Sequence, residues 1–108
     1  MTAPTIALQE LLAKVDAGRW STIRDEPSAE TGLLIYWEQF DLIMSEGSLD
    51  AAMELHEAVF PGWWFQVMRG SAEIRKTHRE VYFSEVYDQP ARAWLCAILK
   101  ALIAECDE

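Results

Sequence analysis

Cysteine is scarce in this sequence, and its placement excludes a disulfide framework. Only Cys96 and Cys106 occur among the 108 residues. Both fall in one expected helix, where a separation of ten positions corresponds to about 15 Å along the axis, too far for a disulfide. We therefore predict two free thiols, with Cys96 in the core and Cys106 at the helix end, as suits a reducing cytoplasm.

Long apolar runs and the spacings typical of metal sites are also missing. The longest apolar runs, at 32–37 and 93–99, fall well short of the roughly 20 residues that span a bilayer. The N-terminus lacks a basic segment followed by an apolar core. No CxxC or HExxH spacing, phosphate-binding loop or nucleophile–base pair occurs. We therefore expect a soluble, unexported cytoplasmic protein that is not an enzyme and has no catalytic residues, metal or cofactor.

Lysine and arginine are absent from the middle of the chain. None occurs between residues 25 and 68, whereas nine of the 18 acidic residues lie there. The remaining nine acids are balanced by nine bases, so the whole net charge of −9 belongs to this stretch. Phosphate binding needs clustered lysine and arginine, so we expect an acidic surface and no direct contact with nucleic acid. The acids of this stretch are Asp25, Glu26, Glu30, Glu38, Asp41, Glu46, Asp50, Glu54 and Glu57.

The apolar pattern predicts helices in the first half of the chain, then strands, then one more helix. Ser48 is a good helix N-cap, and Pro90 suits the first turn of the last helix. The apolar run at 34–37 could form a strand, but its length favours a helix. The expected helices cover 5–17, from 28 or 31 to 46, 48–60, and from 88–90 onward. The expected strands, in an antiparallel meander, cover 63–69, 72–77 and 80–87.

The first expected strand carries large apolar side chains on both faces of the sheet. Trp63, Phe65 and Val67 alternate on one face, and Trp64 and Met68 on the other. Such a sheet is expected to be covered by helices above and below. We therefore predict the α+β class, with a small antiparallel sheet of two to three strands covered by helices on both faces, in the order ααα-βββ-α. The prediction is a single α/β/α-layered domain over residues 1–108.

Two blocks of the sequence resemble a family of small phage proteins. Residues 47–63 and 90–104 resemble the phage ABA sandwich domain family, and residues 10–15 suit its first helix. The resemblance implies a layered α/β/α fold in proteins of phage or prophage origin, with no established activity or catalytic residues to transfer. Residues 24–44 and the segment around Arg75 and Lys76 match less well, so any specific role of this chain is expected there.

Several side chains invite a functional interpretation that has a simpler alternative. His56 lies on the apolar side of its expected helix, which favours a packed core histidine over an acid–base group. His78 is expected in a solvated turn. Trp63 and Trp64 face opposite ways and cannot share a stacking platform. Trp20 lies in the connector at 18–32, where a tryptophan either fills the core or anchors a partner.

The acidic stretch is either a solvated helix surface or a docking surface. Carboxylates on successive helix turns, about 6 Å apart along the axis, roughly imitate the phosphates of a DNA strand. A protein that binds nucleic acid would find such a surface attractive. The residues predicted to contact a partner are Glu30, Glu38, Asp41, Glu46, Asp50, Glu54, Glu57 and Trp20.

Small size, phage-like blocks and one-sided acidity together favour a binding protein. The leading hypothesis is a non-enzymatic phage or prophage protein that acts in the host cytoplasm. It would occupy a basic surface of a host nucleic-acid-binding complex. The most concrete version of this hypothesis is an inhibitor of the anti-CRISPR type that imitates DNA. The alternative is a structural or assembly accessory of the virion, for which a homodimer through the sheet edge or last helix is one arrangement. Neither hypothesis requires a membrane.

Overall fold

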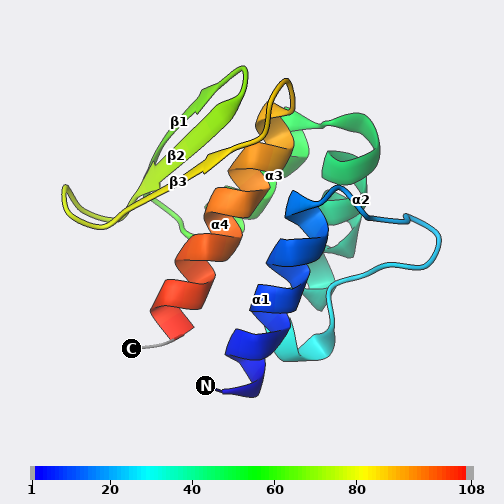
Figure 1. Ribbon diagram of the computed structural model, residues 1–108. Helices are drawn as coiled ribbons and strands as arrows, with labels where there is room; N and C mark the ends of the chain where they lie inside the picture. The colour runs from blue at the N-terminus through cyan, green and yellow to red at the C-terminus, as the bar shows by residue number, and fades with distance from the viewer. Residues whose placement is uncertain (1, 107–108) are drawn as a thin grey trace.

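The last helix is the central element of the fold. The computed structural model describes residues 2–106, with the C-terminal helix α4 between the sheet and the other helices (Figure 1). The elements are α1 (Ala3–Asp16), the short 3₁₀ turns η1 (Ala29–Thr31) and η2 (Leu34–Tyr36), α2 (Trp37–Glu46), α3 (Leu49–Val59), β1 (Trp64–Met68), β2 (Ser71–Arg75), β3 (Val81–Glu85) and α4 (Pro90–Cys106). The predicted α+β class and the order of helices, strands and final helix are confirmed.

Helix α4 is buried almost all round. It packs on β2 and β3 with one side and on α1, α2 and α3 with the others. Its sequence alternates small and large apolar residues, which lets neighbours approach closely from several directions. Its buried residues are Ala91, Ala93, Trp94, Leu95, Cys96, Ala97, Ile98, Leu99 and Ala101. The hydrophobic core is therefore organised around one helix.

The turns and caps follow the local sequence. The Ser48 hydroxyl accepts a hydrogen bond from the Ala51 backbone N–H at 3.1 Å, which confirms the predicted cap of α3. Gly47, at the end of α2, has a φ of 64°, a left-handed conformation that glycine adopts without strain. Pro90 opens α4, as predicted. These signals place α2 and α3 next to each other as a hairpin.

The strands form the predicted antiparallel meander, in the order β1-β2-β3. Trp64 pairs with Arg75, and Met68 with Ser71 across a two-residue turn. Phe65, Val67 and Ile74 point toward the helices and pack in or against the core. This face of the sheet confirms the predicted alternation in β1.

We expected helices on both faces of the sheet, but no helix within residues 2–106 covers its outer face, so this prediction is wrong. Trp64, Met68, Val81 and Phe83, on the outer face of the sheet, are 46%, 60%, 38% and 48% exposed. The Arg75 guanidinium covers part of this face, 4.6 Å from the centre of the Trp64 ring. Helices α1, α2 and α3 pack around α4 instead, because the apolar residues of α4 point in several directions. The fold is therefore a sheet with helices on one face, and the expected α/β/α layering is incorrect.

The start of the second helix was also predicted incorrectly. Helix α2 begins at Trp37, and Glu30 lies in the separate short turn η1. Gly32 ends this turn with a φ of 75°, which a continuous helix cannot accommodate. Residues 34–37 form neither a strand nor regular α-helix over their whole length, but lead from η2 into α2.

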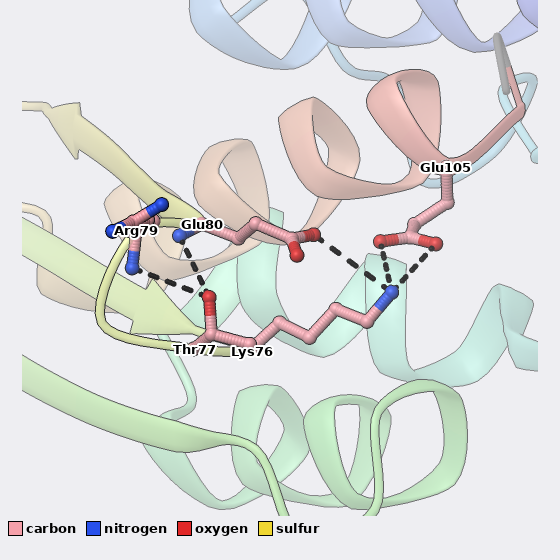
Figure 2. Close-up of polar contacts among 5 residues, drawn as sticks. All are labelled: Lys76, Thr77, Arg79, Glu80 and Glu105. Atoms are coloured by element: carbon pink, nitrogen blue, oxygen red, sulfur yellow. Dashed lines mark hydrogen bonds and ion pairs between the residues drawn. The ribbon is translucent and has the colours of Figure 1, made fainter.

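The turn between β2 and β3 is fixed to the end of α4 (Figure 2). The Thr77 hydroxyl accepts hydrogen bonds from the backbone N–H groups of Arg79 and Glu80, at 3.2 and 3.1 Å. Lys76 Nζ lies 3.3 Å from Glu105 Oε1 and 3.8 Å from Glu80 Oε2. These contacts hold the far end of the sheet against the C-terminal turns of α4.

Candidate partner-binding surface

Five exposed carboxylates line the outer side of the α2–α3 hairpin. We call this set the acidic face: Glu38, Glu46, Asp50, Glu54 and Glu57. Gln39 Nε2 donates to Glu54 Oε2 at 3.2 Å and so joins the two helices beside these residues. Helical spacing aligns Glu38 with Glu46 on α2 and Asp50 with Glu54 on α3, away from the buried side of each helix. Five of the seven predicted acids are therefore exposed on the two helices of this hairpin.

No basic side chain among residues 2–106 forms an ion pair with the acidic face. The bases that form ion pairs do so with other acids. Lys14 binds Asp25, Arg69 binds Asp88, Arg75 binds Glu73, and Lys76 binds Glu80 and Glu105. The acidic face keeps its charge for solvent or a partner.

Apolar side chains are interspersed with these carboxylates. Leu42 is 41% exposed, Leu49 is 46% exposed and Met53 is 37% exposed. Leu42 lies four residues after Glu38 and four before Glu46, so these three share one side of α2. Interfaces combine apolar contact with charge, and these side chains would supply the apolar part of such a contact.

Trp20 and Asp41 contact each other at the edge of the core. Trp20 Nε1 donates to Asp41 Oδ1 at 2.9 Å, and its ring stacks on Phe40 with centroids 5.7 Å apart. Both side chains are half-buried. Of the two roles considered for Trp20, the structure shows the filling of the core edge. Asp41 is turned toward Trp20, because its position on α2 lies next to the buried Phe40.

The acids before α2 lie apart from the acidic face. Glu30 is exposed on η1, which packs against α1. Asp25 accepts hydrogen bonds from Lys14 Nζ at 2.8 Å and from the Ser21 backbone N–H at 2.7 Å. These two bonds, the first with the larger effect, lower the pKa of Asp25 below its ordinary value. The nine acids between residues 25 and 68 therefore do not share one surface. Three of them, Asp25, Glu26 and Glu30, lie in the connector, on the α1 side.

The histidine and tryptophan candidates have structural roles. His56 is fully buried, with Nδ1 3.2 Å from Trp94 Nε1 and Nε2 3.1 Å from the Trp63 carbonyl oxygen. His78 is exposed in the β2–β3 turn. Trp63 stacks on Phe60 with ring centroids 3.9 Å apart, while Trp64 lies on the opposite face of the sheet under Arg75. This geometry agrees with the interpretation of His56 as a packed core histidine, and with Trp63 and Trp64 facing opposite ways.

The cysteines are both free, as predicted. Cys96 is completely buried in α4, and burial is the main reason that the pKa of its thiol rises to about 11. Cys106 is exposed near the end of α4. A buried thiol with a raised pKa is unreactive toward oxidants and electrophiles.

Within the part of the chain that the structure describes, no group of three or more histidine, cysteine or acidic residues could hold a metal ion. None of the helices between residues 2 and 106 is both long and apolar enough to cross a membrane.

The outer face of the sheet is an exposed apolar surface that sequence reasoning did not identify. Its exposed members are Trp64, Met68, Val81 and Phe83. Alternation in β1 and β3 separates these residues from the buried set and could have revealed them. That signal was interpreted as a second buried face, because large apolar residues usually mark one.

Comparison of this chain with protein-family models, with characterised proteins and with solved structures finds no match. The resemblance to the phage ABA sandwich domain family therefore stays a prediction.

Proposed function

We propose that this chain is a non-enzymatic binding protein whose acidic face docks on a basic surface of a partner protein. The observation that carries the proposal is the group of five exposed carboxylates on α2 and α3 that have no ion-pair partner among residues 2–106. Exposed apolar residues between them, such as Leu42, supply the contact area that charge alone lacks.

The proposed partner is a host complex that binds nucleic acid. A channel that holds DNA or RNA is lined with lysine and arginine, which carboxylates on a helix can engage in place of phosphates. Binding would then block the channel both by its bulk and by its charge, and attraction over distance would speed association at low salt. The acidic face imitates DNA in this scheme and does not itself bind nucleic acid.

The more specific form of the proposal is an inhibitor of the anti-CRISPR type, encoded by a phage or prophage and active in the host cytoplasm. It rests on the small size of the chain, on the acidic face, and on the phage resemblance of residues 47–63 and 90–104.

A matched pair of triple variants tests the acidic face. One variant changes Glu38, Glu46 and Glu54 to glutamine. The other changes three exposed acids outside α2 and α3 to the corresponding amides, so that both variants lose the same net charge: Glu10 and Asp16 of α1 and Glu85 of β3. Each tagged protein is used to capture complexes from host lysate at increasing salt, and the captured complex is tested for binding of labelled DNA.

The proposal expects the unchanged chain and the control variant to capture a nucleic-acid-binding complex at low salt and to displace its DNA. The acidic-face variant should lose both properties, and added salt should release the complex. Equal capture by the two variants, or a partner that tolerates high salt, would contradict docking through this face.

The outer face of the sheet favours a second candidate, an assembly accessory of a virion. Trp64, Met68 and Phe83 form an exposed apolar surface around the Arg75–Glu73 ion pair, and such surfaces mark sites of protein contact. If this candidate is correct, the chain co-sediments with purified particles, and changing Phe83 to serine releases it. A chain found only in the soluble host fraction excludes it.

A further inference from the structure

The free edge of β1 has backbone groups with no strand beside them. The Lys76 N–H bonds the Glu80 carbonyl and the Val86 N–H bonds the Gly70 carbonyl, so even-numbered residues of β2 face β3 and odd-numbered ones face β1. Trp64, Gln66 and Met68 are therefore hydrogen-bonded to β2. The N–H and C=O groups of Phe65 and Val67 point away from the sheet, and no other strand within residues 2–106 pairs with β1.

An apolar groove runs along this edge, between β1 and the N-terminal half of α3. Its volume is about 530 Å³, within the range of sites that hold ligands. The floor is rigid, because Phe65 stacks on Trp94 with ring centroids 4.8 Å apart and contacts His56 edge-on at 5.0 Å. The apolar lining consists of Leu49, Met53, Phe65, Val67, Met68, Pro90 and Trp94.

The β3 edge of the sheet is occupied by a charged side chain, whereas the β1 edge is open. On the β3 edge, Lys100 Nζ donates to the outward-facing Phe83 carbonyl at 2.9 Å, so a charged side chain already occupies that edge. The β1 edge has no charged residue, proline or bulge over Trp64–Met68. Natural sheets protect free edges with such features. Their absence on β1 marks it as the edge that is available for pairing.

The charge around the groove indicates what could pair there. Arg69, at one end, is neutralised by Asp88 at 2.8 Å. Asp50 lines the groove, and Glu57 lies two helical turns further along the exposed side of α3. A second copy of this chain would bring the same carboxylates together across the edge, with a net charge of −9 on each protomer. A basic segment would instead be attracted.

We propose that the β1 edge binds an extended peptide segment of a partner, in which apolar residues alternate with basic ones. The segment adds to the sheet as a fourth strand, exchanging hydrogen bonds with the backbone of Phe65 and Val67. Its apolar side chains face the helices and fill the groove over Leu49 and Met53. Its basic side chains alternate to the outer face of the sheet, beside Trp64 and Gln66, and the net charge of −9 attracts them without an ion pair to one particular carboxylate. This inference goes beyond docking of the acidic face, because it specifies a strand-shaped ligand at the β1 edge, in a groove that shares Asp50 with the acidic face.

Short synthetic peptides test the inference directly. The probe is a fluorescently labelled peptide of alternating valine and lysine. One control has glutamate in place of lysine, and another has proline in place of the central valine, which keeps the charge but cannot complete a strand. Affinity is measured by fluorescence anisotropy, and amide hydrogen exchange is followed with and without the peptide.

The valine–lysine peptide should bind at least about tenfold more tightly than either control, a difference of about 1.4 kcal/mol. The amides of Phe65 and Val67 should become protected. Equal binding of the proline peptide, or no new protection on β1, would show simple charge attraction and overturn the inference. A dimer of the free protein that dissociates when Val67 is changed to proline would show that a second copy occupies the edge, and would also overturn it.

Two variants of the protein complete the test. Val67→Pro removes an outward N–H that is not part of the β1–β2 ladder, so the sheet should persist. Met53→Lys places a cation in the groove, and Leu42→Lys makes the same kind of change on α2, outside it. Val67→Pro and Met53→Lys should weaken peptide binding about tenfold or more, while Leu42→Lys should not. Loss of peptide binding in the Glu38/Glu46/Glu54 variant but in neither groove variant would refute the groove and leave the acidic face as the binding site.

Discussion

Trp94 donates its indole N–H to Nδ1 of His56 over 3.2 Å, inside the core. An indole nitrogen can only donate, so Nδ1 must be the unprotonated nitrogen of a neutral imidazole. The proton is then on Nε2, which donates to the Trp63 carbonyl oxygen at 3.1 Å. One histidine therefore joins α3 to α4 and to the start of β1, which is a structural role and not an acid–base one.

We predict that Trp94→Phe and His56→Leu each lower the free energy of unfolding by about 1–3 kcal/mol. Trp94→Phe leaves Nδ1 of His56 without its hydrogen bond, and His56→Leu leaves both the Trp94 N–H and the Trp63 carbonyl oxygen without theirs. The double variant should lose less than the sum of the two, since neither side of the Trp94–His56 hydrogen bond is then left alone. Urea unfolding of the four proteins measures this coupling. Strict additivity would contradict the hydrogen bond between the two side chains.

Loss of the α3 cap should have a smaller and more local effect. Ser48→Ala removes the acceptor for the Ala51 N–H and should cost about 1 kcal/mol. Ser45→Ala is the matched control, because Ser45 lies inside α2 and bonds only the carbonyl of the preceding turn. Thermal unfolding should separate the two variants, and equal melting temperatures would show that the cap does not stabilise α3.

The buried thiol makes stability depend on alkaline pH. Burial raises the pKa of Cys96 from 9.0 to about 11. Between these values the unfolded chain loses the proton while the folded protein keeps it, so the free energy of unfolding falls as pH rises. The slope from this group is at most about 1.4 kcal/mol per pH unit. Denaturant unfolding of Cys96→Ala should show a shallower decline, and parallel curves for the two proteins would contradict the prediction.

The Lys14–Asp25 ion pair of the connector should make stability depend on pH in the acidic range. Lys14 and the Ser21 N–H lower the pKa of Asp25 below 3.8, so the stability they provide is present above that pH and is lost as pH falls through the folded value. Asp25→Asn should therefore be less stable than the unchanged chain at neutral pH, with the difference shrinking in acid. Glu26→Gln is the control, since Glu26 is exposed. A difference that persists at low pH would point to a cause other than charge.

Much of the fold followed from local pattern. The cap at Ser48, the proline that opens α4 and the alternation in β1 are signals carried by neighbouring residues, and the structure confirms them. The covering of the sheet was predicted incorrectly, because alternation shows that Trp64 and Trp63 face opposite ways but not what lies over each. The helices pack around α4 because its apolar residues face several directions. Which elements cover each of these directions depends on tertiary packing and not on local sequence.

The candidate site was predicted in part for the same reason. Sequence placed acids on two helices, and five of them remain exposed on α2 and α3. It could not show that Asp41 turns to Trp20 or that Lys14, eleven positions away, binds Asp25. The groove beside β1 was not predicted at all, because it arises where α3, β1 and α4 meet.

The central position of α4 also constrains how the chain acquires its structure during synthesis. Helix α1 and strands β2 and β3 all make their main helical contacts with this final segment. While the ribosome is still translating residues before 90, those elements have no apolar partner to bury against. The strands can pair with one another earlier, and so can α2 with α3, but α1 and the inner face of the sheet are buried only after α4 has left the exit tunnel.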